Sequence, residues 1–316
     1  MKNVAAVEDL KMQFGNKTAV NGISFEVREG EVLGLLGPNG AGKSTTIHLL
    51  SGVLSANSGN VTILGHNVKK GSKEMKKGIG VVPQDIAIYE EISAEKNVHF
   101  FASLYSLKGE KLKARVKEAL ELVQLYDRKD DKPKTFSGGM KRRLNIACAI
   151  AHQPKLIIMD EPTVGIDPQS RHHILESIKE LKTRGASIIY STHYMEEAEA
   201  IADRIMIMNE GRIIANGTKE ELYREVNKEM TYAFQLTHVQ PLNKNAIREI
   251  KGVTEVDFSD HQLKVTVQQN HDHLSEIIAE LSAQGCNILS MNKKEASLET
   301  VFLELTGRNL KIRRAK

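Results

Sequence analysis

Two kinds of hydrophobic pattern run through the first two thirds of the chain. Residues 4–27 alternate apolar and polar side chains around a turn at 15–17, which predicts two antiparallel strands with one buried face. Short apolar runs, typical of parallel strands buried on both faces, recur at 32–36, 79–82, 156–159 and 186–191. Helical segments lie between these runs, so the sequence predicts an α/β fold.

The period changes to that of a helix in residues 93–126, where apolar side chains recur every three or four positions with Lys and Glu between them. Together with a helix at 141–152, this segment predicts a helical subdomain over about 90–150. A hairpin at 205–215 and a final short helix close a first domain that we expect to span 1–228.

A second, smaller domain is predicted over 229–307. Its elements follow the order strand, helix, strand, strand, helix, strand, which is that of an α+β ferredoxin-like domain. His271 and His273 have no third ligand nearby, so we expect them to be solvated and to hold no metal. The tail 308–316 carries five basic residues and is expected to be disordered.

Composition narrows the class of protein. The chain has 316 residues, 41% hydrophobic and 27% charged, as in ordinary globular proteins. No apolar run is long enough to cross a bilayer. Cys148 and Cys286 lie far apart without metal or redox spacing, which favours a reducing cytoplasm. A net charge of +4 without a basic stripe gives no reason to expect nucleic-acid binding.

The strongest chemical signal is a glycine-rich loop between a predicted strand and a predicted helix. Its spacing, Gly, four residues, Gly-Lys-Ser, is that of a phosphate-binding loop. The loop consists of Gly37, Pro38, Asn39, Gly40, Ala41, Gly42, Lys43, Ser44 and Thr45. A plain turn with a solvated lysine is the alternative, but the strand before and the helix after favour a nucleoside triphosphate site.

Three further places carry candidate chemistry. Asp160 and Glu161 directly follow an apolar strand, where ligand-binding groups gather in α/β sheets. A solvated acidic pair is the alternative. Ser137 is a candidate helix cap, followed by two glycines that free backbone N–H groups. Phe14, beside the first turn, would either stack on a purine ring or belong to the core.

In this order, these residues resemble those of ATP-binding cassette (ABC) transporter ATPases. The matching features are the phosphate loop, Gln84, Ser137-Gly138-Gly139, Asp160-Glu161, Asp167 and His193. The resemblance covers about 4–226 and implies a P-loop fold with a RecA-like core, an antiparallel β subdomain and a helical subdomain. Two positions depart from the family pattern, Met140 after the two glycines and Ile166 before Asp167.

The resemblance implies ATP and Mg²⁺ as cofactors. Phe14 would stack on adenine, and residues 37–45 would cradle the phosphates, with Lys43 contributing charge to catalysis. Ser44 and Gln84 would ligate Mg²⁺, and Asp160 would hold the metal through water.

The remaining roles are implied in the same way. Glu161 would polarise the attacking water, with His193 at the γ phosphate and Gln84 completing the catalytic group. Ser137, Gly138 and Gly139 would bind the γ phosphate of ATP held by a second subunit. Asp167 would link the two sites.

The ending of the second domain narrows the resemblance. Residues 296–307 are similar to the ending of ATPases that serve ABC-2-type permeases, largely exporters of drugs, antibiotics or lipid-linked compounds. The implied partners are a second ATPase subunit, expected to form a homodimer, and separate transmembrane permease subunits. The implied location is cytoplasmic, peripheral on the inner face of the membrane. The second domain would either regulate the dimer or be a structural appendage.

Two other functions fit parts of the sequence. A soluble ABC ATPase acting on ribosomes or nucleic acid is the alternative, but those proteins usually carry two cassettes, coiled coils or zinc motifs. A small P-loop kinase or GTPase would leave 137–139 and His193 unexplained.

Overall fold

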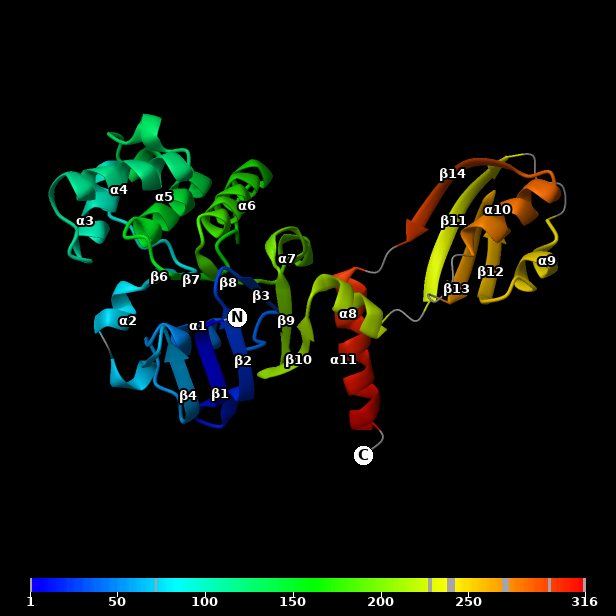
Figure 1. Ribbon diagram of the computed structural model, residues 1–316, viewed down its shortest axis with the longest axis horizontal. Helices are drawn as coiled ribbons and strands as arrows, with labels where there is room; N and C mark the ends of the chain where they lie inside the picture. The colour runs from blue at the N-terminus through cyan, green and yellow to red at the C-terminus, as the bar shows by residue number, and fades with distance from the viewer. Residues whose placement is uncertain are drawn as a thin grey trace. The chain divides into compact units, whose positions relative to one another are not determined.

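The computed structural model describes residues 2–71, 73–226, 229–237, 242–268, 273–294 and 297–314. The chain divides into two compact units, Met1–Lys219 and Glu220–Lys316. Each is described by itself (Figure 1).

A six-stranded sheet forms the centre of the first unit, in the order β10-β9-β3-β8-β7-β6. All neighbouring strands are parallel except the terminal hairpin of β9 and β10. The strands are β3 (Val32–Leu36), β6 (Ile79–Val82), β7 (Leu156–Asp160), β8 (Ser187–Thr192), β9 (Arg204–Asn209) and β10 (Arg212–Gly217). The predicted α/β fold is confirmed.

Alternate residues of the central strands enter two different cores. Leu33, Leu35 and Ile158 belong to a cluster shared with helix α1 (Lys43–Leu50) and the second sheet. Their neighbours Val32 and Ile157 belong to a cluster on the other face, shared with the helical region. Burial on both faces explains why apolar residues follow one another in these strands without alternating with polar ones.

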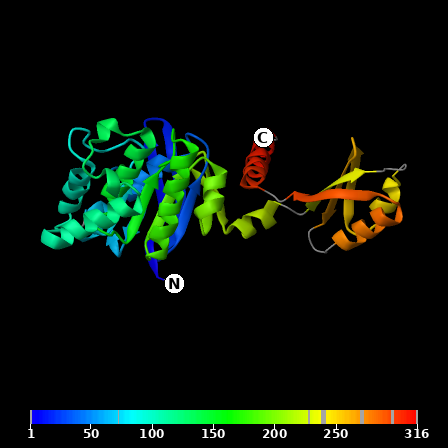
Figure 2. The ribbon, with the colours of Figure 1, turned by 90° about the horizontal axis from the view of Figure 1, so that it is seen from above.

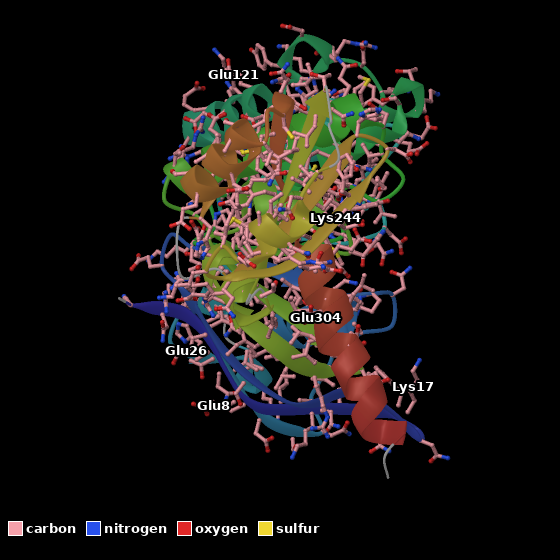
Figure 3. All side chains as sticks on the ribbon, turned by 90° about the vertical axis from the view of Figure 1, so that its right-hand side faces the viewer. Glu8, Lys17, Glu26, Glu121, Lys244 and Glu304 are labelled. Carbon is pink, nitrogen blue, oxygen red and sulfur yellow. The ribbon has the colours of Figure 1, made fainter. Side chains whose placement is uncertain are left out.

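The second sheet of this unit is antiparallel, in the order β2-β1-β4-β5. It comprises β1 (Asn3–Phe14), β2 (Lys17–Arg28), β4 (Ser58–Ile63) and β5 (His66–Asn67). As predicted, β1 and β2 form a hairpin around residues 15–16. The outer face is polar, and Glu8 and Glu26 extend from it (Figure 3).

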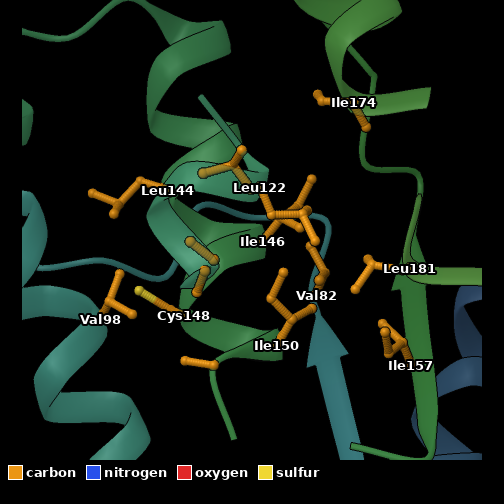
Figure 4. Close-up of a cluster of buried hydrophobic side chains, with 14 of the residues drawn as sticks. Val82, Val98, Leu122, Leu144, Ile146, Cys148, Ile150, Ile157, Ile174 and Leu181 are labelled. Carbon is orange, nitrogen blue, oxygen red and sulfur yellow. The ribbon is translucent and has the colours of Figure 1, made fainter. Parts of the chain in front are cut away.

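Helices cover the other face of the central sheet and continue beyond it (Figure 1). They are α3 (Ala94–Ser103), α4 (Gly109–Leu122), α5 (Gly138–Ile150), α6 (Pro168–Thr183) and α7 (Met195–Ile201), with 3-10 turns at Tyr126–Arg128 and Pro133–Thr135. Helix α2 (Lys73–Lys77) and the 3-10 turn at Val68–Lys70 lie on the opposite side, where Met75 and Val68 join the cluster shared with α1 and the second sheet. Apolar residues of α5, including Leu144 and Ile146, pack with Val98 of α3 and Ile157 of β7 (Figure 4). Helix α5 therefore joins the helical region to the sheet.

The second unit contains a four-stranded antiparallel sheet in the order β12-β13-β11-β14. Two helices lie on one face of it (Figure 2), and their Ile247, Ile277 and Leu281 share a core with the strands. The elements are α8 (Lys219–Val226), β11 (Glu229–Thr237), α9 (Lys244–Arg248), β12 (Val253–Ser259), β13 (Gln262–Gln268), α10 (Leu274–Ala283), β14 (Asn287–Lys294) and α11 (Leu298–Arg314). This is the predicted ferredoxin-like arrangement.

Two expectations for the second unit are wrong. Helix α11 continues to Arg314 where a disordered tail was expected, because a single glycine costs a helix only about 1 kcal/mol and good helix formers follow Gly307. His273 is 4% exposed, not solvated. Gly252 makes this possible, since a Cβ there would lie 2.3 Å from Nε2 of His273. His271 lies outside the described residues.

Two structural findings bear on membranes and metals. None of the helices in the described ranges combines the length and apolar character that a membrane span requires. Within the same ranges, no group of three or more His, Cys, Asp or Glu side chains is placed to hold a metal ion.

The helical core predicts a specific stability difference. Ile146 on α5 is fully buried in the cluster that joins the helical region to the sheet. Ile146→Ala should therefore lower the free energy of unfolding by about 2–5 kcal/mol. Leu104 is 64% exposed, so Leu104→Ala should change it by no more than about 0.5 kcal/mol. Urea unfolding followed by circular dichroism measures both, and equal effects would contradict the packing described here.

Candidate functional site

The phosphate loop connects β3 to α1, as the sequence predicts. Two of its glycines are required by the backbone. Gly42 has φ +103°, and a Cβ there would lie 2.4 Å from the carbonyl oxygen of Ala19. Gly40 has φ +82°, and its missing Cβ would point into open space. The loop can therefore present its backbone N–H groups to a ligand on the Gly40 side.

A cavity of about 430 Å³ lies against this loop. It brings together residues from five separate parts of the chain, and the lining includes Phe14, Asn39, Gly40, Gly42, Lys43, Ser44, Thr45, Gln84, Glu161 and His193. The ring of Phe14 is half exposed at this wall, as a stacking residue would be. Gly37, Pro38 and Ala41 belong to the loop but do not line the cavity.

The buried carboxylate of Glu161 lies between the ammonium group of Lys43 and the imidazole of His193 in this cavity. Glu161 Oε1 is 2.9 Å from Lys43 Nζ, and Glu161 Oε2 is 3.1 Å from His193 Nδ1. Lys43 Nζ also donates to the carbonyl oxygens of Gly37 at 2.7 Å and Pro38 at 3.2 Å. Lys43 and Glu161 are almost fully buried, so their charges interact with little solvent screening.

The backbone at Glu161 is strained. Its φ is +44°, in the left-handed region that non-glycine residues rarely adopt. The backbone N–H of Glu161 donates to Ser191 Oγ at 2.9 Å, which fixes this conformation from the neighbouring strand β8. Strain of this kind is concentrated at functional sites.

Asp160 lies behind the cavity and is 2% exposed. Its Oδ1 accepts hydrogen bonds from Ser44 Oγ at 3.1 Å and from Ser191 Oγ at 2.8 Å. The carboxylate is thus directed at the hydroxyl group on the first turn of α1. Together with Gln84 in the cavity wall, Ser44 provides the type of oxygen ligand that Mg²⁺ prefers.

The Ser-Gly-Gly segment is not part of this cavity. Ser137 caps α5 by accepting from the backbone N–H of Met140 at 3.2 Å, and Ser137 and Gly138 are exposed. Gly139 is buried against α6. A side chain does not fit there, since a Cβ would lie 2.0 Å from Ser170 Oγ.

Asp167 caps the neighbouring helix α6. Its Oδ1 accepts from the backbone N–H of Ser170 at 2.9 Å, and this hydrogen bond lowers the pKa of the Asp167 carboxyl group.

Several residues at the site were not expected from the sequence. Lys17, Ala19 and Val164 also line the cavity. Arg142 donates to the carbonyl oxygens of Pro83 at 2.9 Å and Gln84 at 2.5 Å, and burial lowers the pKa of its guanidinium group. Arg142 is only three residues after Gly139, but the sequence could not show its partners, because they lie more than 50 residues away.

The fold and the site together define an ATPase of the ABC type, with a phosphate loop, an acidic strand end and a histidine around one cavity. Comparison with known proteins agrees. Residues 20–164 match the ABC transporter family. A solved structure of an ATP-binding subunit of an ABC transporter aligns with 70% of this chain and 92% of its own, at a TM-score of 0.65 and 33% identity.

The comparisons also show which ABC transporter ATP-binding proteins this chain is similar to. Residues 217–306 match the C-terminal domain of DrrA1-3-like ATP-binding proteins. Linearmycin resistance ATP-binding protein LnrL of Bacillus subtilis is 45% identical over 96% of this chain and 98% of its own length. Nod factor export ATP-binding protein I of Rhizobium sp. is 36% identical over 95% and 96%. The chain belongs to the family of ABC transporter ATP-binding proteins, carries the DrrA-type C-terminal domain, and binds ATP.

The two loop glycines predict different costs of substitution. Both Gly42→Ala and Gly40→Ala place a Cβ at positive φ, but only Gly42→Ala also forces a Cβ against a backbone carbonyl. Gly40→Ala should cost about 1–2 kcal/mol, and Gly42→Ala clearly more. Thermal unfolding of the two variants in parallel measures the difference, and a Gly42→Ala variant as stable as Gly40→Ala would contradict the geometry of the loop.

Proposed function

We propose that this chain is the ATP-hydrolysing subunit of an ABC-2-type exporter, acting as a dimer at the inner face of a membrane through separate permease subunits. The observation that carries the proposal is the position of Glu161, held in the nucleotide cavity between Lys43 and His193. The names of the relatives, which refer to antibiotic resistance and Nod factor export, support export of an antibiotic or lipid-like compound. They do not support a soluble ATPase acting on ribosomes.

The residues present fit ATP with Mg²⁺. The open side of Gly40, the ammonium group of Lys43 and the hydroxyl group of Ser44 offer donors and one metal ligand on the same wall of the cavity. No cluster of acidic side chains within the described ranges would hold a metal alone, so Ser44 and Gln84 would share the ion with the phosphates. When bound, Mg²⁺ would neutralise charge on the phosphate oxygens.

Glu161 is the general base in this proposal. A carboxylate accepts a proton from water or orients it, and Glu161 faces the space that a γ phosphate would enter. The phosphates would attract Lys43, which would loosen the ion pair of Glu161 with Lys43 and leave the carboxylate available to a water molecule. His193 would then donate to the γ phosphate, and Lys43 with the loop N–H groups would stabilise the charge of the transition state.

A second copy of the chain would complete each site. Ser137 and Gly138 are exposed and lie outside the cavity of their own chain. Their N–H groups, at the N-terminus of the 13-residue helix α5, suit a phosphate oxygen of ATP held by the other subunit. ATP would thereby bind the closed dimer better than the separate chains, and its hydrolysis would let the subunits part. Asp167 would lie near this contact.

The surface next to Gln84 is our candidate for docking of the permease. Tyr89 is 52% exposed and packs against Phe100 and Phe101, with ring centroids 5.3 Å and 6.1 Å away. The amide of Asn97 binds the backbone N–H and carbonyl of Tyr89 at 2.8 Å and 2.9 Å. Exposed aromatic rings on a fixed backbone are typical of protein interfaces, and Glu90 lies beside them.

Glu161→Gln tests the catalytic assignment. The amide keeps the size of the side chain but is a poor base, so turnover should fall by about 100-fold or more. ATP binding should persist, and the variant should form a stable dimer with ATP, measurable by size-exclusion chromatography. Glu196→Gln, an exposed carboxylate on α7, is the control and should hydrolyse ATP normally. Near-normal hydrolysis by Glu161→Gln would refute the assignment.

Charge reversal tests the docking surface. Glu90 and Glu91 pair with Lys141 at 2.5 Å and Lys134 at 3.4 Å beside the aromatic cluster. Replacing both glutamates by Lys should prevent co-purification of the permease and abolish transport, while ATP binding by the isolated chain persists. The control replaces Glu110 and Glu176, which also pair with lysines but lie on α4 and α6. An intact, transporting complex with the first pair reversed would exclude this surface.

A further inference from the structure

One buried carboxylate outside the nucleotide cavity has no role in the mechanism above. Glu197 lies on α7 and is 2% exposed. Its Oε2 accepts three hydrogen bonds, from Thr192 Oγ1 at 2.8 Å, Thr163 Oγ1 at 2.9 Å and the Tyr190 hydroxyl at 2.9 Å. Burying a carboxylate is costly unless donors of this kind compensate for lost hydration. Three hydroxyl groups therefore converge on one oxygen.

Two of the three donors lie close in sequence to the reacting groups, Thr163 in the loop after β7 and Thr192 at the end of β8. Thr163 is two residues after Glu161, and Thr192 directly precedes His193. Thr192 Oγ1 also accepts the backbone N–H of Tyr194 at 2.9 Å, which fixes the turn that contains His193. The carboxylate of Glu197 is thus a bridge between the loop after β7 and the end of β8, next to His193.

The third donor, Tyr190, differs from the other two. Its side chain is fully buried within the body of β8. Burial and the nearby Glu197 carboxylate raise the pKa of Tyr190 far above its ordinary value, so the phenol remains a donor. The Tyr190 hydroxyl also lies 3.3 Å from Thr163 Oγ1, but Tyr190 itself is adjacent in sequence to neither Glu161 nor His193. Thr163 and Thr192 keep their own hydrogen bonds to Glu197 when the Tyr190 hydroxyl is removed, so Tyr190 serves as the comparison for the two threonines.

The other oxygen of Glu197 faces a third element. Arg171 Nε on α6 lies 3.4 Å from Oε1 of Glu197, and the Arg171 guanidinium group stacks 4.6 Å from the ring centroid of Tyr194. Arg171 is one helical turn after Asp167, whose carbonyl oxygen accepts the Arg171 backbone N–H at 2.9 Å. The network therefore extends to the helix whose start we place near the second subunit.

We propose that Glu197 is a positioning residue that holds the Glu161 and His193 loops in register for hydrolysis. The inference rests on the proposed ATPase mechanism, in which these two side chains act on the same phosphoryl group. Their contact, 3.1 Å between Oε2 and Nδ1, joins two loops that follow different strands. A displacement of about 1 Å in such a group can cost about 100-fold in rate, so the bridge matters to turnover more than to ATP binding.

Three substitutions, each removing one hydroxyl group from the same oxygen, test the proposal in the full-length protein. Thr163→Val and Thr192→Val should each lower kcat by about 10- to 100-fold, with KM for ATP changed by less than about twofold. Tyr190→Phe should lower the thermal unfolding temperature about as much as each threonine variant does, but it should keep kcat within about twofold. The serine variants Thr163→Ser and Thr192→Ser, which retain the hydroxyl group, should recover most of the turnover.

Coupling between the two threonines provides a second measurement. Since either valine breaks the same bridge, the double variant should be little slower than the slower single variant, and the two effects should not multiply. Glu197→Gln keeps an acceptor oxygen but loses the charge facing Arg171, so it should lower kcat with KM for ATP unchanged. This variant tests the proposal if a valine variant does not fold.

Three results would overturn the proposal. They are a loss of kcat in Tyr190→Phe equal to that of the threonine variants, multiplicative effects in the double variant, and a Glu197→Gln protein with normal kcat. Absence of hydrolysis by the wild-type protein with ATP and Mg²⁺ would instead count against the proposed function. The two failures are thereby distinguished.

Discussion

The buried ion pair of Glu161 with Lys43 is the interaction around which the first unit is arranged. Opposite charges in a poorly solvated site attract strongly, and each would be costly to bury alone. Each is supplied by a different part of the chain, Lys43 by the loop after β3 and Glu161 by the end of β7. Strand β8 lies between β3 and β7 in the sheet. Its Ser191 binds both Asp160 and the backbone of Glu161, and His193, which directly follows the strand, contacts the Glu161 carboxylate.

In the proposed mechanism, this geometry would let the cavity respond to nucleotide. Lys43 is held by two backbone carbonyl oxygens and a carboxylate, all of which phosphate oxygens can replace. The same event that binds ATP would therefore change the electrostatic surroundings of Glu161. The helical region would sense it through Arg142, which connects α5 to the backbone at Gln84.

Local patterns sufficed for the features that depend on neighbours in sequence. The limits of β6 agree with the predicted segment 79–82, the second domain has the predicted order of elements, and the phosphate loop lies between a strand and a helix as expected. Short elements such as α2 and β5 were missed, because five and two residues carry too little periodicity. The helical insertion is two helices, α3 and α4, joined around 104–108.

Contacts between distant residues could not be predicted in the same way. The strand order places β7 beside β8, and only this order brings Thr163 and Thr192 to one carboxylate. Glu197 is one of several acidic residues in its segment, and nothing in the sequence distinguishes the buried one from its exposed neighbours. The role of each predicted site residue in catalysis remains a prediction, supported for Lys43, Gln84, Glu161 and His193 by their convergence on one cavity.

The left-handed backbone at Glu161 sets the stability of one turn against the proposed catalytic role of the side chain. Glycine adopts that conformation without steric penalty, so a glycine at this position would relax the turn after β7. The same change would also leave the buried Lys43 without the carboxylate that pairs with it. That the chain has a glutamate there indicates that the molecule tolerates a less comfortable turn for the sake of the acid it presents.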